Sequence, residues 1–165
     1  MPHDDIRHLL QRRDLAATRY RAAVSRQLGL GDSEMLAVAH LAQRGRLTPG
    51  ELGHLLDLSS GGVSALVQRL EEHGHIVREP HPTDGRSNVV RLSPPMIERT
   101  GHALSPLVTD LDRVIETFDD EQRRAIVAFL TRAAELSEQH ADRAYAQLSG
   151  GARPAPTTPV PSLWG

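Results

Sequence analysis

The chain has 165 residues, of which 39% are hydrophobic and only 3% are aromatic, and its formal net charge is −2. A core with so few aromatic residues is built from Leu, Val, Ile and Ala, which is typical of helical proteins. Cysteine is absent, which excludes disulfides, thiolate metal sites and cysteine-based redox chemistry. The small negative charge argues against a protein that coats nucleic acids non-specifically. It allows a sequence-specific DNA-binding protein with a few well-placed Arg.

The sequence contains no apolar run of roughly 18 residues, so no membrane-spanning helix is predicted. Its first ten residues include Asp4 and Asp5 and lack the apolar segment of a signal peptide. All 19 basic residues are Arg, which a GC-rich coding sequence explains. We therefore expect a soluble, cytoplasmic protein.

Two helices are predicted before residue 46. Apolar residues spaced three and four apart indicate a helix over Asp4–Leu28, which Gly29–Gly31 ends. A second helix is expected over about Ser33–Gln43, ending at Gly45. Its expected apolar face comprises Leu36, Ala39, His40 and Leu41.

A helix-turn-helix is predicted next. The segment Thr48–Glu51 has the signature of a capping box, with Pro at the first helical position. The helix that it begins ends near Asp57, and Ser59 or Ser60 caps a second one that ends at His73–Gly74. A connection this short between two helices is typical of a helix-turn-helix. The apolar face of the second helix comprises Val63, Leu66, Val67 and Leu70.

A two-stranded ribbon follows. Ile76–Glu79 and Val89–Leu92 are short β-prone runs, and turn-forming residues separate them. The order of helix, turn, helix and ribbon predicts a winged helix-turn-helix. The turn formers of the ribbon tip are Pro80, Pro82, Asp84, Gly85 and Asn88.

The C-terminal third is predicted to be helical. Ser93–Pro94 caps a helix that extends to about Glu116, and Pro106 should kink or break it. Asp119 with Gln122 caps the last helix, which ends near residue 148.

The first and the last two helices have broad apolar faces that a small winged domain cannot cover, so we expect them to interlock in a two-fold dimer. The fold class is therefore mainly α with a small β-wing, a winged helix-turn-helix with long N- and C-terminal dimerisation helices. The expected divisions are an N-terminal dimerisation helix (1–30), the DNA-binding domain (31–93), C-terminal dimerisation helices (94–148) and a disordered Pro/Gly-rich tail (149–165).

The outer face of the second helix of the helix-turn-helix offers the DNA contacts. Ser60 and Ser64 can bond phosphates or bases, Gln68 can pair with adenine, and Arg69 is a candidate phosphate contact. The simpler alternative is that Gly61–Gly62 only loosens the helix start and that Gln68 faces solvent.

Asp84 and Arg86 lie at the ribbon tip, two residues apart. An Arg on a projecting ribbon suits the minor groove, where the potential is negative, and a nearby Asp can orient it. The alternative is that Asp84 only stabilises the turn and that Arg86 is a surface residue with no role in DNA binding. Following this ribbon and this helix, the pair favours a role in DNA binding.

The span Leu47–Leu92 resembles the multiple antibiotic resistance regulator (MarR) family of winged-helix transcription factors. The resemblance implies a homodimer that binds a pseudo-palindromic double-stranded DNA operator, and we expect the protein to be a ligand-responsive repressor. It also implies that the helix beginning at Ser59 reads the major groove and that Arg86 enters the minor groove. The family usually has Leu-Thr-x-x-Gly after the second wing strand, where this chain has Leu92-Ser93-Pro94-Pro95-Met96. The residues that carry the resemblance are Leu47–Thr48, Glu51–Leu52, Leu58–Val63, Arg69–Leu70, Gly74, Arg78, Asp84, Arg86, Val90 and Leu92.

The predicted DNA-binding residues are Thr48, Ser59, Ser60, Gly61, Gly62, Ser64, Gln68, Arg69, Asp84 and Arg86.

Many relatives in this family release DNA when a small anionic or phenolic effector binds between the dimer helices and the DNA-binding lobe. Arg12, Arg13, Arg19 and Tyr20 on the first helix are candidates for lining such a site. The alternative is that they form the polar face of an amphipathic helix.

The sequence also bears on three other function classes. The sequence contains no phosphate-binding Gly loop, nucleophile elbow or HExxH motif, so an enzyme is not expected. His73, His75 and His81 lie around the wing, which leaves a metal-responsive regulator as an alternative, although no His pair has helical metal-ligand spacing. The other alternative is a winged helix that binds protein instead of DNA. No cofactor or metal ion is predicted.

Overall fold

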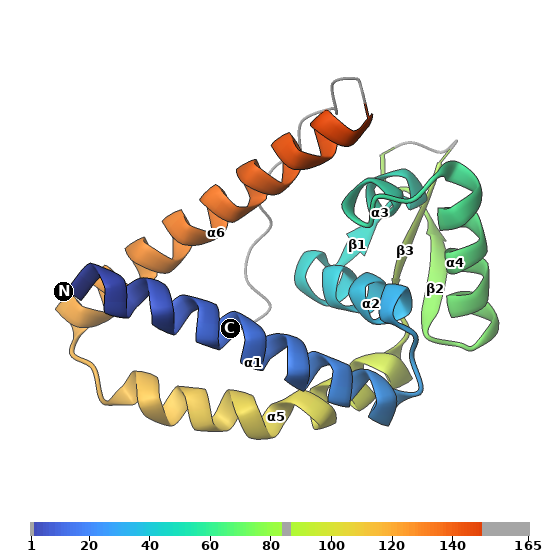
Figure 1. Cartoon of the computed structure of the whole chain (residues 1–165). Coiled ribbons are helices and arrows are strands. Elements are labelled where there is room, and N and C mark those ends of the chain that lie inside the picture. Colours follow the sequence, from blue (N-terminus) through green and yellow to red (C-terminus); the bar gives the residue numbers. More distant parts are fainter. Residues whose placement is uncertain (1, 84–86, 150–165) are drawn as a thin grey trace. The chain divides into compact units, whose positions relative to one another are not determined.

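The computed structural model describes residues 2–83 and 87–149 and confirms the predicted mainly α fold with a small β-wing. Its helices are α1 (Pro2–Leu28), α2 (Asp32–Arg44), α3 (Pro49–Leu55), α4 (Ser60–Glu72), α5 (Pro94–Glu116) and α6 (Asp120–Ser149) (Figure 1). Its strands are β1 (Arg46–Leu47), β2 (Ile76–Pro80) and β3 (Asn88–Leu92). None of the described helices is long and apolar enough to span a bilayer.

The described chain forms two compact units that divide within α5, between Ser105 and Pro106. The first unit contains the sheet, whose strand order is β1-β3-β2 with both pairings antiparallel. α4 packs beside β2 and α3 packs against α4 (Figure 1). Aliphatic side chains fill the space between these elements, as the composition predicted. The largest of the fully buried side chains are Val38, Leu41, Leu52, Leu66, Val67, Leu70, Ile76, Val90 and Met96.

The strand β1 was not predicted. It has two residues, too few for an alternating pattern to be visible in the sequence. Arg46 pairs with Arg91 and Leu47 with Val90, so β1 adds a third strand to the edge of the ribbon. This pairing joins the chain just before the helix-turn-helix to the wing that follows it.

The buried face of α2 differs from the prediction. Met35, Val38 and Leu41 are buried, whereas Leu36 is 40% exposed. Met35, Val38 and Leu41 follow one another at three-residue spacing, so they share a face that points into the core. The expected face correctly included Leu41 but was rotated toward Leu36.

Pro106 does not break α5, contrary to one of the two predicted outcomes. The helix continues from Pro94 to Glu116 with Pro106 inside it. Pro lacks the N–H that would bond the carbonyl oxygen of His102, four residues earlier. The hydroxyl of Ser105 donates to that oxygen at 3.3 Å, so a neighbouring side chain replaces the missing donor.

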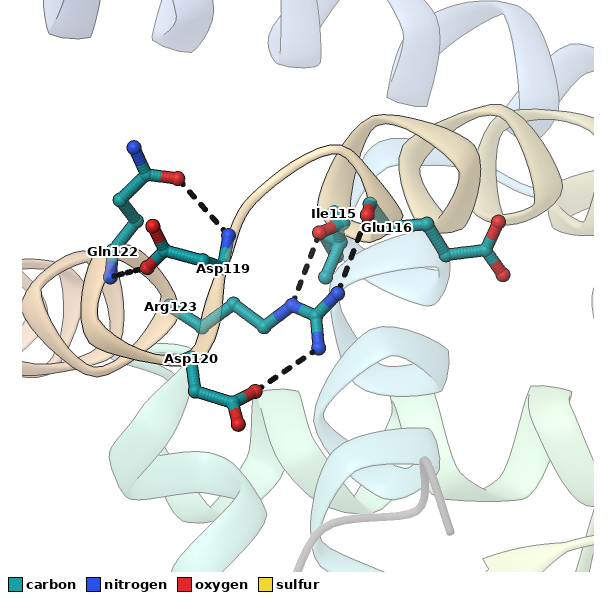
Figure 2. A network of polar contacts seen from close by, with 6 residues as sticks. All are labelled: Ile115, Glu116, Asp119, Asp120, Gln122 and Arg123. Atoms are coloured by element: carbon teal, nitrogen blue, oxygen red, sulfur yellow. Dashed lines mark hydrogen bonds and ion pairs between the residues drawn. The ribbon is translucent and has the colours of Figure 1, made fainter.

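The second unit contains the end of α5 and all of α6. The predicted cap of α6 is confirmed, because the backbone N–H of Gln122 donates to Asp119 Oδ1 at 2.9 Å and the side chain of Gln122 accepts from the N–H of Asp119 at 3.0 Å. Figure 2 shows this reciprocal pair at the start of α6.

Arg123 closes the same turn from the other side. Its Nε donates to the carbonyl oxygen of Ile115 at 3.2 Å and its Nη2 to that of Glu116 at 3.3 Å, while Nη1 contacts Asp120 at 3.4 Å (Figure 2). A cationic donor at the C-terminal end of a helix satisfies carbonyl groups that have no partner within the helix. The turn between α5 and α6 is therefore capped at both helix ends.

Candidate nucleic-acid interface

The start of the helix-turn-helix is capped as predicted. The hydroxyl oxygen of Thr48 accepts from the N–H of Glu51 at 3.2 Å, and Glu51 Oε2 accepts from the N–H of Thr48 at 2.7 Å. Pro49 occupies the first helical position, where its missing N–H costs nothing. The side chain of Thr48 is thus occupied by the cap of α3, and its predicted contact with DNA stays a prediction.

A tight turn leads from α3 into α4. Asp57 has a φ of +53°, and the N–H of Leu58 bonds the carbonyl oxygen of Gly53 at 2.9 Å. Gly53 is buried, and a Cβ atom at this position would lie 3.2 Å from both Cβ and Cγ1 of Val63. The two helices of the motif therefore meet where α3 has no side chain.

Ser59, and not Ser60, is the N-cap residue of α4. Its hydroxyl oxygen accepts from the N–H of Gly62 at 3.2 Å. Ser60 and Gly61 are exposed, and beyond its chain neighbours and the adjacent helix backbone nothing lies within 4 Å of the position that a Cβ of Gly61 would take. The first turn of α4 consequently presents backbone and small side chains to solvent, and helix N-termini of this kind attract phosphate groups.

The exposed face of α4 is the one predicted, because Val63, Leu66, Val67 and Leu70 are buried. Ser64 and Gln68 are exposed, and each bonds within the helix. The hydroxyl of Ser64 donates to the carbonyl oxygen of Ser60 at 2.8 Å, and Nε2 of Gln68 donates to Glu72 Oε1 at 2.8 Å. Both side chains lie on the surface, where they can exchange these bonds for contacts with DNA.

Arg69 contacts a residue that the sequence analysis missed. Its Nε lies 3.5 Å from Oε1 of Glu34, which is on α2 and whose side chain is only 14% exposed. Glu34 Oε2 also accepts from the N–H of Gly31 at 2.9 Å. An acid three residues after the start of a helix is the sequence signal of such a cap. The partner on α4 could not be found from spacing, because 35 residues separate the two.

The strands of the wing pair from Ile76 with Leu92 to Pro80 with Asn88. On this ribbon Arg91 forms an ion pair with Glu79, at 2.7 Å between Nε and Oε1. The predicted tip residues Asp84 and Arg86 lie outside the described residues.

The junction between the wing and α5 carries the departure from the family pattern. Ser93 is buried, its hydroxyl donates to the carbonyl oxygen of Gly74 at 2.6 Å, and the N–H of Met96 donates back to that hydroxyl at 3.3 Å. Met96 is buried in the core. The hydroxyl of Ser93 therefore joins the end of α4 to the start of α5.

The effector candidates occupy different environments. Arg12 and Arg19 line a hollow along α1, together with Leu15 and other described residues of that helix. Arg13 and Tyr20 are not part of its described lining. Arg13 is exposed beside Asp14, and the hydroxyl of Tyr20 bonds the carbonyl oxygen of Ala103.

Burial lowers the pKa of His40 and of His75. Burial, followed by the charges of Arg44 and Arg21, lowers the pKa of His40. Burial, followed by the charges of Arg99 and His73, lowers the pKa of His75, which Glu34 partly opposes. The rings of His73 and His75 lie edge to face, 5.7 Å apart. Over residues 2–83 and 87–149, no three acidic or His side chains are grouped to hold a metal ion.

Sequence comparison identifies relatives of the chain. A model of the MarR family matches residues 28–87. The chain is 33% identical over 127 residues to YcgE of Bacillus subtilis (strain 168), described as an uncharacterized HTH-type transcriptional regulator. That match covers 75% of this chain and 80% of YcgE.

Solved structures share the fold at lower identity. NadR in complex with 4-hydroxyphenylacetate is similar with a TM-score of 0.56 and 20% identity, over 77% of this chain and 89% of NadR. A MepR mutant from S. aureus bound to an oligodeoxyribonucleotide is similar with a TM-score of 0.51 and 18% identity, over 79% of this chain and 96% of MepR. The chain therefore belongs to the MarR family of winged helix-turn-helix transcriptional regulators, which act by binding DNA and are not enzymes.

Proposed function

We propose that the protein is a ligand-responsive repressor that binds a pseudo-palindromic operator as a homodimer. The observation that carries this proposal is the surface of α4. Its first turn exposes Ser60 and Gly61 beside the Ser59 cap, and Ser64 and Gln68 continue the same exposed face. A helix with small residues at its start can approach base edges closely in the major groove. A protein that acts on the chromosome in this way works in the cytoplasm.

Each side chain has its own role in the proposed complex. Ser60, Gly61 and Ser64 approach bases or phosphates, and Gln68 exchanges its bond to Glu72 for an adenine edge. Ser59, Gly62 and Thr48 lie at the two helix starts, where backbone N–H groups meet the phosphate chain. Arg86, oriented by Asp84, enters the minor groove.

The proposal of a homodimer is supported by exposed apolar side chains. Within the second unit, the end of α5 and the length of α6 leave large aliphatic and aromatic groups in contact with solvent. In the first unit, Ile6, Leu9 and Leu15 of α1 are exposed in the same way. Burying such faces against a two-fold partner removes them from water. The exposed groups of the second unit are Leu107, Leu111, Val114, Ile115, Ile126, Val127, Phe129, Leu130, Leu136 and Tyr145.

A homodimer determines the spacing between the two half-sites of the operator. Two recognition helices related by a two-fold axis would reach successive turns of one duplex face when they lie roughly 34 Å apart. In this arrangement residues 1–30 and 94–148 supply the dimer contacts, and residues 31–93 supply the DNA contacts.

A small anionic or phenolic effector is proposed to weaken this complex. The NadR structure contains 4-hydroxyphenylacetate, a phenolic acid, bound to a protein of the same fold. Arg12, with Arg19 in the hollow along α1, offers cationic groups to a carboxylate. Arg13 and Tyr20 on the same helix are the other candidates.

A gel shift with the intergenic DNA upstream of the protein's own gene tests the proposal. The wild type is expected to bind at low salt, and Arg86→Ala is expected to weaken binding by about 1–3 kcal/mol. Size-exclusion chromatography with light scattering should give a dimer. Absence of binding at low salt, or a monomer at micromolar concentration, would contradict the proposal.

The effector is tested on the same complex by titration with aromatic acids, including 4-hydroxyphenylacetate and salicylate. Release of DNA by one of them, reduced in Arg12→Ala, is the expected result. If none of these acids changes operator affinity, the ligand-responsive part of the proposal fails while DNA binding stands.

A further inference from the structure

Glu34 connects the start of α2 to the middle of the recognition helix α4. One carboxylate oxygen accepts from the N–H of Gly31 at 2.9 Å, and the other lies 3.5 Å from Nε of Arg69. The side chain of Glu34 is only 14% exposed, whereas that of Arg69 is 51% exposed. The carboxylate of Glu34 is therefore already fixed in place. Only the side chain of Arg69 loses conformational entropy when the two groups pair.

The position of Arg69 around α4 separates it from the serine side chains. At about 100° per residue, Ser60 and Ser64 lie on one flank of the exposed face and Arg69 lies on the opposite flank. That flank faces α2, since it carries the contact with Glu34. If Arg69 turned to a phosphate group, it would leave a largely buried carboxylate without its cation, which is costly.

We propose that Arg69 is a positioning residue and not a phosphate contact: its ion pair with Glu34 holds α4 against α2 and sets the angle at which Ser60 and Ser64 meet DNA. This inference rests on the proposed DNA-binding function. It replaces the phosphate contact that the sequence predicted for Arg69.

A second contact ties down the same half of α4. Glu71 pairs with Arg78 of β2 at 3.1 Å. Within residues 2–83 and 87–149, these two ion pairs are the ones that α4 forms, and both lie in its second half. The recognition helix is thus held to α2 on one side and to the wing on the other. Its first half, with Ser60 and Ser64, faces solvent and is the part proposed to approach DNA. Contacts of this kind are weakened when the supporting residues let them shift by about 1 Å.

The salt dependence of operator binding distinguishes positioning from phosphate contact. Each Lys or Arg that neutralises a phosphate contributes about 0.9 to the slope of log K against log salt concentration. Operator affinity is measured by fluorescence anisotropy at several salt concentrations for the wild type, Arg69→Gln, Glu34→Gln and the double variant. The measurements are made well below the lowest melting temperature of the four proteins, so that each is folded.

A positioning role predicts that Arg69→Gln and Glu34→Gln each weaken operator binding about five-fold or more, with the salt slope of the wild type. The double variant should bind no worse than the weaker single variant, because both changes break one contact. Arg69→Lys should recover part of the affinity by keeping the charge pair.

Three results would overturn the inference. A slope reduced by about 0.9 in Arg69→Gln identifies a phosphate contact. Unchanged or tighter binding by Glu34→Gln shows that Glu34 does not support the complex, and additive losses in the double variant show two separate roles. In each case the wild type still binds, so the proposed function survives. Failure of the wild type to bind any operator is the different result that removes the proposed function itself.

Discussion

The hydroxyl of Tyr20 on α1 donates a hydrogen bond to the carbonyl oxygen of Ala103 on α5 at 2.9 Å, joining residues 83 positions apart. Arg99 strengthens the same attachment, because its Nη2 donates to the carbonyl oxygen of Leu28 at 2.7 Å. The phenol of Tyr20 therefore has a structural role whether or not an effector binds nearby.

Tyr20→Phe should lower the free energy of unfolding by about 0.5–1.5 kcal/mol, the usual net value of one hydrogen bond. Urea denaturation monitored by circular dichroism measures it. Thr18→Ala is the control, because the hydroxyl of Thr18 bonds only a carbonyl of its own helix, at Asp14. Equal losses in the two variants would show that the bond between α1 and α5 contributes nothing beyond a local one.

Removing the cap of the recognition helix should destabilise the protein. Ser59→Ala leaves the N–H of Gly62 without its acceptor, at an expected cost of about 1 kcal/mol, whereas Ser59→Asp should retain most of the stability. Thermal denaturation of the two variants checks this. Ser33→Ala on α2 is the control, since Ser33 is exposed and does not cap its helix. A stability of Ser59→Ala equal to the wild type would rule out the cap.

Gly53→Ala should disturb the crossing of α3 and α4. The added Cβ would lie 3.2 Å from Val63, so the side chain of Val63 must move by a few tenths of an ångström, at an expected cost of about 1–3 kcal/mol. Gly61→Ala is the contrasting variant, because its Cβ meets nothing and Ala favours a helix by about 1 kcal/mol over Gly. Chemical denaturation of both variants gives the comparison.

A double variant tests the cause. If the clash with Val63 is responsible, Val63→Ala should cost less in the Gly53→Ala background than in the wild type. Simple additivity of the two losses would place the effect of Gly53→Ala elsewhere.

Stability should depend on pH through His40. Burial, then Arg44 and Arg21, lowers its pKa in the folded state, so the unfolded chain binds its proton more readily. The stabilisation is complete above the ordinary pKa of about 6.5 and is lost as the pH falls through the lower folded-state value. Urea midpoints at pH 7.5 and 5.5 should therefore fall further in the wild type than in His40→Gln. An identical fall in both proteins would exclude His40 as the cause.

The helix caps and the buried face of α4 were predictable because they depend on neighbouring residues. The capping box of Thr48 and Glu51, the buried face of α4 and the reciprocal cap of Asp119 with Gln122 were all confirmed. Each depends on residues three or four apart, a spacing that the chain displays directly.

Contacts between distant segments were not predictable. The pairing of Leu47 with Val90 and the ion pair of Glu34 with Arg69 exist only once the chain has folded. The face of α2 was misjudged for a related reason: Leu36 and Met35 are both apolar, and only packing against the sheet decides which one is buried. The sequence around Pro106 predicts a possible break because the compensating bond from Ser105 depends on the rotation of its side chain.

The hydrogen bonds that Arg123 forms across the α5–α6 turn affect how two chains would associate. Two helices whose connecting turn is hydrogen-bonded at both helix ends hold their apolar side chains in a fixed arrangement before a second chain binds. Less conformational entropy is then lost when two chains associate. This favours a higher association rate and a lower dissociation constant for the dimer.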